Sequence, residues 1–324
     1  MNRVRPLFLF SLSRSGSTLL QRMLATHPLI STRAEPWLLL PIWDMLEHDA
    51  RTFSVYGHEL AIRAVMEFAD GLPGGRRALR DRPKALALDL YAEAADENAR
   101  YFLDKTPAYS LICRQVMEMF PEGRFVWLTR NPLAVAASLM ETFADGKWYL
   151  YRRFHELYLG LSELVACHEA NHDAMLKLRY EDLLCSPEAE MARLFEYLDI
   201  PAEDVDWRQF AAVDLRGSMQ DPTGVKAYDA LASEPLTKWR QSFDNPFRQS
   251  WARRYLRWIG RERLSLMGYD LDEMLAELDS IPVRVRGMAG DALRHLYGLW
   301  RVYSQADAAA LMRRQPEEKR GALH

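Results

Sequence analysis

Hydrophobic residues gather in short runs along the chain, and helical patterns separate these runs. Residues 7–12 are almost wholly apolar, and similar runs occur at 125–129 and 175–178. Runs of this length without polar alternation are typical of strands that helices cover on both faces. We therefore predict three buried strands at these positions.

Helical patterns follow the predicted strands. From residue 18 onward the apolar positions fall on one helical face, and Pro28 then disfavours further helix. Asn131 and Pro132 supply an N-cap and a first-turn proline for a second helix. A longer amphipathic helix is predicted over 154–168, where apolar residues recur every three or four positions.

Strands that alternate with helices predict an α/β fold with a central parallel sheet flanked by helices. Residues 44–104 carry helical patterns and a glycine-rich turn but no strong strand signal, so we expect a helical insertion there. We assign residues 1–280 to one domain. Residues 281–324 are helical and basic, and we interpret them as a C-terminal extension whose apolar helix is of a kind that can support a homodimer.

The composition is that of a folded, enzyme-sized protein. Of 324 residues, 49% are hydrophobic and 27% are charged, and the net charge is -3. A chain so close to neutral has no global field for nucleic acid or an anionic membrane, so any anion site has to be local. No apolar stretch reaches the roughly 18 residues of a membrane helix. Three scattered cysteines favour the cytoplasm, and we expect no metal site.

Residues 13–18, Ser-Arg-Ser-Gly-Ser-Thr, lie between the first predicted strand and the first predicted helix. Free backbone N–H groups and the helix dipole attract anions at such a junction. The loop differs from the phosphate loop of nucleotide-hydrolysing proteins, because Ser11 and Ser17 stand where that pattern has glycine and lysine. Arg14 is the available cation instead. Small polar residues suit any strand-to-helix turn, so the loop alone also fits a structural role.

Several segments together resemble the PAPS-dependent sulfotransferases, in the form found in the carbohydrate and tyrosylprotein branches and their bacterial relatives. They are FLFSLSRSGSTLLQRML, DKTP, FVWLTRNPLAVAASLM, LRYEDLLCSPE and LTKW, in this order over about residues 6–240. The resemblance implies a P-loop-like sulfotransferase fold. It also implies that the co-substrate is PAPS, 3′-phosphoadenosine 5′-phosphosulfate, and that PAP is the second product.

The resemblance assigns an anion site to each of two strand-to-helix junctions, with the nucleoside between them. The first would hold the 5′-phosphosulfate through Arg14, Ser15, Gly16, Ser17 and Thr18. The second would hold the 3′-phosphate through Arg130 and Ser138.

Three further residues are assigned to the nucleotide. Tyr180 would lie near it, and a late loop with Ser218 and Lys226 would close over it. Taken alone, Arg130 would be a surface arginine and Tyr180 a packing aromatic.

The acceptor has to lose a proton as it attacks sulfur, so a base is needed. The histidine that serves the cytosolic branch is excluded, because Pro107 stands at its place after Lys105 and Thr106. In the tyrosylprotein branch the base is a glutamate twenty-one residues after the loop arginine, which corresponds here to Glu35. Lys105 matches a lysine that stabilises the transferring sulfonate. Without these matches, Glu35 would be a solvated carboxylate and Lys105 a surface lysine.

These assignments predict an enzyme that transfers a sulfonate group from PAPS to a hydroxyl or amine. A nucleotide kinase or other phosphotransferase with a degenerate loop stays open, as does a non-catalytic protein that binds PAP or PAPS. The acceptor is a small molecule, a carbohydrate or a peptide. Aromatic residues in the variable loops suggest an aromatic-lined acceptor pocket; they are Trp37, Trp43, Phe53, Tyr56, Trp148, Tyr149 and Tyr151.

Overall fold

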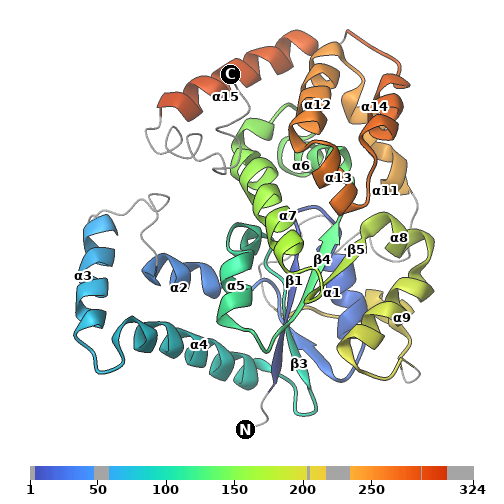
Figure 1. Cartoon of the computed structure of the whole chain (residues 1–324). Helices are drawn as coiled ribbons and strands as arrows, with labels where there is room; N and C mark the ends of the chain where they lie inside the picture. Colours follow the sequence, from blue (N-terminus) through green and yellow to red (C-terminus); the bar gives the residue numbers. More distant parts are fainter. Residues whose placement is uncertain (1–3, 47–57, 203–204, 217–233, 286, 305–324) are drawn as a thin grey trace.

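Five parallel strands form the centre of the molecule, in the order β2-β3-β1-β4-β5 (Figure 1). The computed structural model describes residues 4–46, 58–202, 205–216, 234–285 and 287–304. The strands are β1 (Arg5–Phe10), β2 (Ile30–Thr32), β3 (Tyr101–Asp104), β4 (Arg124–Thr129) and β5 (Met175–Arg179). β1 lies in the middle of the sheet, where Leu7 is in register with Leu103 on one side and Arg124 on the other. The predicted parallel sheet and its three predicted strands are confirmed.

Helices pack on both faces of the sheet. The first face is covered by α1 (Ser17–Ala25), α8 (Tyr180–Cys185), α9 (Pro187–Leu198) and the turn η4 (Trp207–Ala212). The core of the second face includes residues of α4 (Gly75–Ala94), α5 (Cys113–Met119), α6 (Pro132–Ala144), α7 (Leu161–Ala170), α12 (Pro246–Ile259), α13 (Arg261–Met267) and α14 (Leu271–Asp279). Leu7 and Leu9 pack in the first core, whereas Phe8 and Phe10 pack in the second. Because successive side chains of β1 pack into two different cores, all four positions from Leu7 to Phe10 are apolar.

The remaining elements connect these layers or extend from them. They are α2 (Leu39–Leu46), α3 (His58–Asp70), η1 (Pro107–Leu111), η2 (Leu150–Arg153), η3 (His155–Gly160), α11 (Glu234–Thr237), η5 (Lys238–Phe243) and α15 (Met288–Ser304). In Figure 1, α2, α3 and α4 lie to one side of the sheet, and α15 lies at the top of the view. α15 packs against α12 and η2, so the described part of the C-terminal extension is attached to the body of the protein.

The interpretation of residues 44–104 as helical without a strand is wrong at its end. Its described part contains α3 and α4 as expected, but residues 101–104 form β3, which pairs with β1. β2 was not predicted either. The two strands have four and three residues, which is too short for a periodic pattern to distinguish them from a loop.

The predicted helix over 154–168 also differs in its first part. It begins as a π-helix, η3, and becomes an α-helix only from Leu161 onward. π-Helical turns are rare, and they are frequent at functional sites. None of the described helices combines the length and the apolar composition needed to cross a lipid bilayer.

The loops after β1, β3, β4 and β5 meet at one edge of the sheet, because parallel strands all end on the same side. Ligands of open α/β sheets bind at this edge. The helix after β4 begins as predicted: the Asn131 side chain accepts the N–H groups of Leu133 at 2.9 Å and Ala134 at 3.2 Å, and Pro132 is the first helical residue. This edge therefore presents two well-defined helix N-termini, those of α1 and α6.

Candidate active site

The loop between β1 and α1 contains two residues with positive φ. Arg14 has φ 68° and Gly16 has φ 90°. A Cβ on Gly16 would lie 2.3 Å from the ring of Tyr180, so this position excludes any side chain. Left-handed residues in a turn direct successive N–H groups into one concavity that attracts anions. The other polar residues of the predicted site are buried around the first turn of α1: Ser15, Ser17 and Thr18.

Arg130 follows β4 and contacts this loop. Its Nη1 donates to the carbonyl of Arg14 at 2.6 Å, and its guanidinium lies 4.4 Å from the centre of the Tyr180 ring. Arg14 Nε donates to the hydroxyl of Ser138 in α6 at 3.1 Å. The resemblance implied two anion sites separated by a nucleoside, whereas these contacts join the two arginines through one network. Ser138 accepts from Arg14 and keeps its own hydroxyl proton, which it can donate to an anion.

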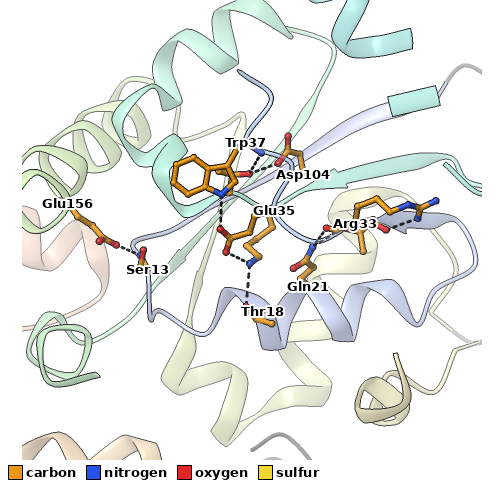
Figure 2. A network of polar contacts seen from close by, with 11 residues as sticks. Ser13, Thr18, Gln21, Arg33, Glu35, Trp37, Asp104 and Glu156 are labelled. Atoms are coloured by element: carbon orange, nitrogen blue, oxygen red, sulfur yellow. Dashed lines mark hydrogen bonds and ion pairs between the residues drawn. The ribbon is translucent and has the colours of Figure 1, made fainter. Parts of the chain in front are cut away.

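Lys105 follows β3 and is buried, with 2% of its side chain exposed. Its Nζ donates to Glu35 Oε1 at 2.8 Å and to the hydroxyl of Thr18 at 3.3 Å. Trp37 Nε1 donates to the second oxygen of Glu35 at 3.2 Å (Figure 2). A buried ammonium needs a paired charge and further hydrogen bonds, and Glu35 and Thr18 supply both. Lys105, Glu35 and Thr18, all assigned from the sequence, thus come together at the start of α1.

Trp37 is held in an unusual backbone conformation. Its φ is 54°, in the left-handed region that bulky residues rarely adopt. The ring is 40% exposed and lines the pocket beside Glu35. Such strained residues cluster at ligand sites. The sequence suggested Trp37 only as one of seven aromatic candidates, and its contact with Glu35 could not be read from spacing.

Asp104 is the last residue of β3 and is completely buried. Its carboxyl accepts the hydroxyls of Tyr91 at 2.6 Å, Tyr109 at 3.1 Å and Thr106 at 3.0 Å. Burial raises its pKa to about 6, although these three hydrogen bonds act in the opposite direction. Because Asp104 ties α4 and η1 to the end of β3, it fixes the backbone from which Lys105 extends. The sequence showed it only as the first letter of the DKTP motif.

A second carboxylate reaches the phosphate-loop region from the π-helix. Glu156 is buried and accepts the backbone N–H of Ser13. Its other oxygen lies 3.8 Å from Arg153 Nη1. Sequence reasoning missed this residue, because 143 positions separate it from Ser13 and a π-helix has no recognisable sequence pattern. Glu156 connects the loop to η3.

A pocket of about 350 Å³ lies over these groups. Of the residues assigned from the sequence, those that line it are Arg14, Gly16, Ser17, Thr18, Glu35 and Arg130. Lys105 lies behind Glu35, and Ser15, Ser138 and Tyr180 do not line the pocket. Arg153, His155 and Glu156 line the pocket wall that η2 and η3 provide. Ser218 and Lys226 lie outside the described residues.

The expected aromatic lining holds only in part. Trp37 lines the pocket, but Trp43 and Trp148 are buried in the second core, so their interpretation as acceptor contacts is wrong. Their indoles pack among core side chains, because amphipathic rings serve cores as readily as ligand pockets. Phe53 and Tyr56 lie outside the described residues. Within the described part of the chain, no group of three or more His, Cys, Asp or Glu side chains could hold a metal ion.

The fold has a counterpart among solved structures. The sulfotransferase domain from the curacin biosynthetic pathway superposes with a TM-score of 0.55 at 20% identity, over 83% of this chain and 99% of that chain. This likeness supports the fold assignment.

Among the relatives that match in sequence are a nodulation protein and a protein-tyrosine sulfotransferase. Nodulation protein NoeE of Sinorhizobium fredii is 34% identical over 137 residues, which are 42% of this chain and 31% of that protein. The protein-tyrosine sulfotransferase of Drosophila melanogaster is 22% identical over 290 residues, which are 83% of this chain and 52% of that protein. The chain therefore spans less than two thirds of the length of these relatives. The model of the sulfotransferase family matches residues 6–204, and the chain belongs to this family.

Proposed function

We propose that this protein transfers the sulfonate group of PAPS to a hydroxyl or amine of an acceptor and releases PAP. The observation that carries the proposal is the network at the carboxyl edge of the sheet, where Arg14 and Glu35 line one pocket and Lys105 bonds to Glu35. Cations that bind an anionic donor thus lie next to a carboxylate that can accept a proton. Family membership supports the same reaction.

In this proposal the nucleotide has a phosphate group at each end, and two sets of residues would hold them. The N–H groups of the loop and the start of α1 would hold the phosphosulfate together with Arg14, and the narrow approach of Tyr180 to Gly16 keeps that concavity in shape. Arg130 and Ser138 would hold the 3′-phosphate. Arg130 also stacks on Tyr180, which leaves its guanidinium oriented rather than free to rotate.

The transfer requires one bond to break and one to form. The bond between sulfur and the bridging phosphate oxygen breaks, and its electron pair stays on PAP. A bond forms between sulfur and the acceptor oxygen or nitrogen, and the acceptor proton passes to Glu35. Arg14 and Lys105 would stabilise the negative charge that grows on the bridging and sulfonyl oxygens.

A phosphotransferase is the weaker alternative. The lysine that reaches the outer phosphates in nucleotide hydrolases has no counterpart in the loop, where Ser17 stands at its place. A non-catalytic PAP-binding protein would need no carboxylate, yet Glu35 is held between Lys105 and Trp37. The non-catalytic alternative therefore does not account for this arrangement.

The experiment that tests the proposal compares the protein with its Glu35→Gln variant. We expect PAP to form from PAPS in the presence of a mixed acceptor library, with a mass gain of one sulfonate on the acceptor. Glu35→Gln keeps the size of the side chain, and its one amide oxygen can still accept from Lys105 or from Trp37. It cannot take the proton, so turnover falls by about 100-fold or more. PAP binding, followed by calorimetry, stays within about three-fold of the unsubstituted protein, because no phosphate contact is lost.

Glu118→Gln is the matched control, since Glu118 is an exposed residue of α5 away from the pocket. Turnover of Glu35→Gln within a few-fold of this control would refute Glu35 as the base. PAP binding without sulfonation of any acceptor would favour the non-catalytic alternative, and ATP turnover would favour the phosphotransferase.

A further inference from the structure

A row of aromatic rings leads from the pocket to the outer surface of the protein. It consists of Phe143, Tyr149, Tyr151, Tyr297 and Trp300, and we call it the aromatic path. Successive ring centres are 6.4, 6.2, 6.4 and 6.1 Å apart. Phe143 lines the pocket, and Trp300 lies on α15. The path therefore connects the site to an element distant in sequence.

The rings at both ends of the path are accessible. Phe143 is 41% exposed, Tyr297 51% and Trp300 66%. Tyr149 and Tyr151 are half-buried between them. Large aromatic rings are costly to expose, and contiguous exposed ones mark interaction sites. Through Phe143 the path is continuous with the pocket, rather than an isolated patch.

Charged groups accompany the first rings. The guanidinium of Arg153 lies 4.0 Å from the centre of Phe143, and that of Arg152 lies 5.7 Å from the centre of Tyr149. Arg153 also lines the pocket. The path therefore offers cationic hydrogen-bond donors over the faces of its first two rings, and its three tyrosines add hydroxyls that both donate and accept.

The position of α15 is fixed by its inner side. Asp291 accepts from Arg248 at 2.7 Å and from Asn245 at 2.9 Å. A Cβ on Gly298 would lie 2.2 Å from the Tyr151 side chain, so the backbone of α15 packs directly against Tyr151 of η2. These inner contacts hold the helix, and Tyr297 adds a ring contact to Tyr151 of η2.

The chemistry of the path favours a chain of sugar rings as its occupant. The face of an aromatic ring carries negative potential and attracts the polarised C–H groups on the face of a sugar, while sugar hydroxyls pair with tyrosine and arginine at the ring edges. An acyl chain would leave those donors without partners. A peptide brings backbone N–H groups, for which the side chains of the path offer only the three tyrosine hydroxyls as acceptors, whereas each sugar hydroxyl can pair with a tyrosine or an arginine.

We propose that the aromatic path binds an oligosaccharide acceptor whose terminal sugar enters the pocket and whose following sugars stack toward Trp300. This inference rests on the proposed function. It predicts that acceptor binding strengthens with chain length, because each further sugar gains a ring. A single sugar, by contrast, contacts the pocket alone.

The test measures binding of sugars to the PAP-saturated protein. An array of immobilised oligosaccharides identifies the preferred type, and oligomers of that type with one to six sugars are then titrated by calorimetry. Tyr297→Ala/Trp300→Ala removes the outer two rings. We expect it to weaken binding of the longest oligomer by about ten-fold, which corresponds to two aromatic contacts, and to leave the single sugar unaffected. In turnover assays the loss is in KM, with kcat unchanged.

Leu293→Ala is the matched control, since Leu293 is 67% exposed on the same helix but outside the path. Thermal unfolding checks that both variants keep their fold. The inference fails if no oligosaccharide binds, if length dependence survives in the double variant, or if a tyrosine-containing peptide binds instead and loses affinity in that variant. PAP binding and PAP formation are measured alongside; their absence would instead refute the proposed function.

Discussion

The Asp104 carboxyl lies fully inside the protein, one residue before the lysine of the site. Three hydroxyls surround it, yet burial dominates and its pKa is raised to about 6 from an ordinary 3.8. The folded protein therefore holds this proton more tightly than the unfolded chain does. The resulting contribution to stability is complete below about pH 4, and it is lost as the pH rises through 6.

Asp104→Asn should remove this pH dependence. The difference between the two pKa values corresponds to about 3 kcal/mol, so the free energy of unfolding of the unsubstituted protein, relative to the variant, should fall by up to that amount between pH 3.5 and pH 7. Urea unfolding at several pH values measures it. Asp173→Asn, at an exposed position, serves as the control. A stability difference that stays constant or grows with pH would contradict the raised pKa.

At the scale of elements, the start of α1 depends on how closely it approaches the start of α8. Gly16, the N-cap of α1, faces the ring of Tyr180, the first residue of α8. Glycine is required at this position for two reasons: the backbone has a φ of 90°, and a Cβ would collide with the Tyr180 ring. The shape of the loop after β1 and the packing of two helices are thus set at one residue.

Gly16→Ala should therefore cost about 2 kcal/mol or more in the free energy of unfolding, and should weaken PAP binding as well. Gly287→Ala is a matched control, because Gly287 also has a positive φ, 79°, but nothing lies within 4 Å of its added Cβ. The control carries the backbone strain alone, about 1 kcal/mol, with PAP binding unchanged. Equal stability losses in the two variants would show that contact with Tyr180 is unimportant.

A comparison of the predicted and observed strands shows how much of the fold could be predicted from the sequence. Strands β1 and β4 were predicted because burial on both faces leaves a run of apolar residues. The edge strand β5 is only partly buried and was predicted from its shorter apolar stretch. β2 and β3 were missed because their identity depends on their neighbours in the sheet, which a local pattern does not contain.

The residues of the site likewise divide into those that the sequence could predict and those that depend on contacts in the fold. Arg14 and Arg130 follow strands, so their junctions could be recognised, and Glu35 and Lys105 came from the family resemblance. Glu156 and the hydroxyls around Asp104 arrive from other parts of the fold, through contacts that no spacing encodes.

At the scale of the whole molecule, charge is distributed unevenly. The chain carries a net charge of -3, but Arg14, Arg130 and Arg153 all line one pocket. An overall negative protein does not attract anions from a distance, so the affinity for a nucleotide has to come from these few groups at close range.

Affinity for PAP should therefore depend on ionic strength. Raising the salt from about 0.05 M to about 0.5 M shortens the screening length several-fold and should weaken PAP binding by about ten-fold. The affinity for AMP, which lacks the 3′-phosphate, should fall less over the same range of salt. Calorimetric titrations at four salt concentrations measure, for each nucleotide, the slope with which the affinity falls as salt rises. Identical slopes for PAP and AMP would mean that Arg130 and Ser138 do not contact a phosphate.

The strand order also has a consequence for how the chain is made. β1 is synthesised first, but its two neighbours in the sheet are β3 and β4, which end at Asp104 and Thr129. At ordinary rates of translation, on the order of ten seconds pass between the release of β1 and that of its last partner. During this time the nascent chain carries an apolar strand with both edges unpaired, and an edge of this kind invites pairing with other chains.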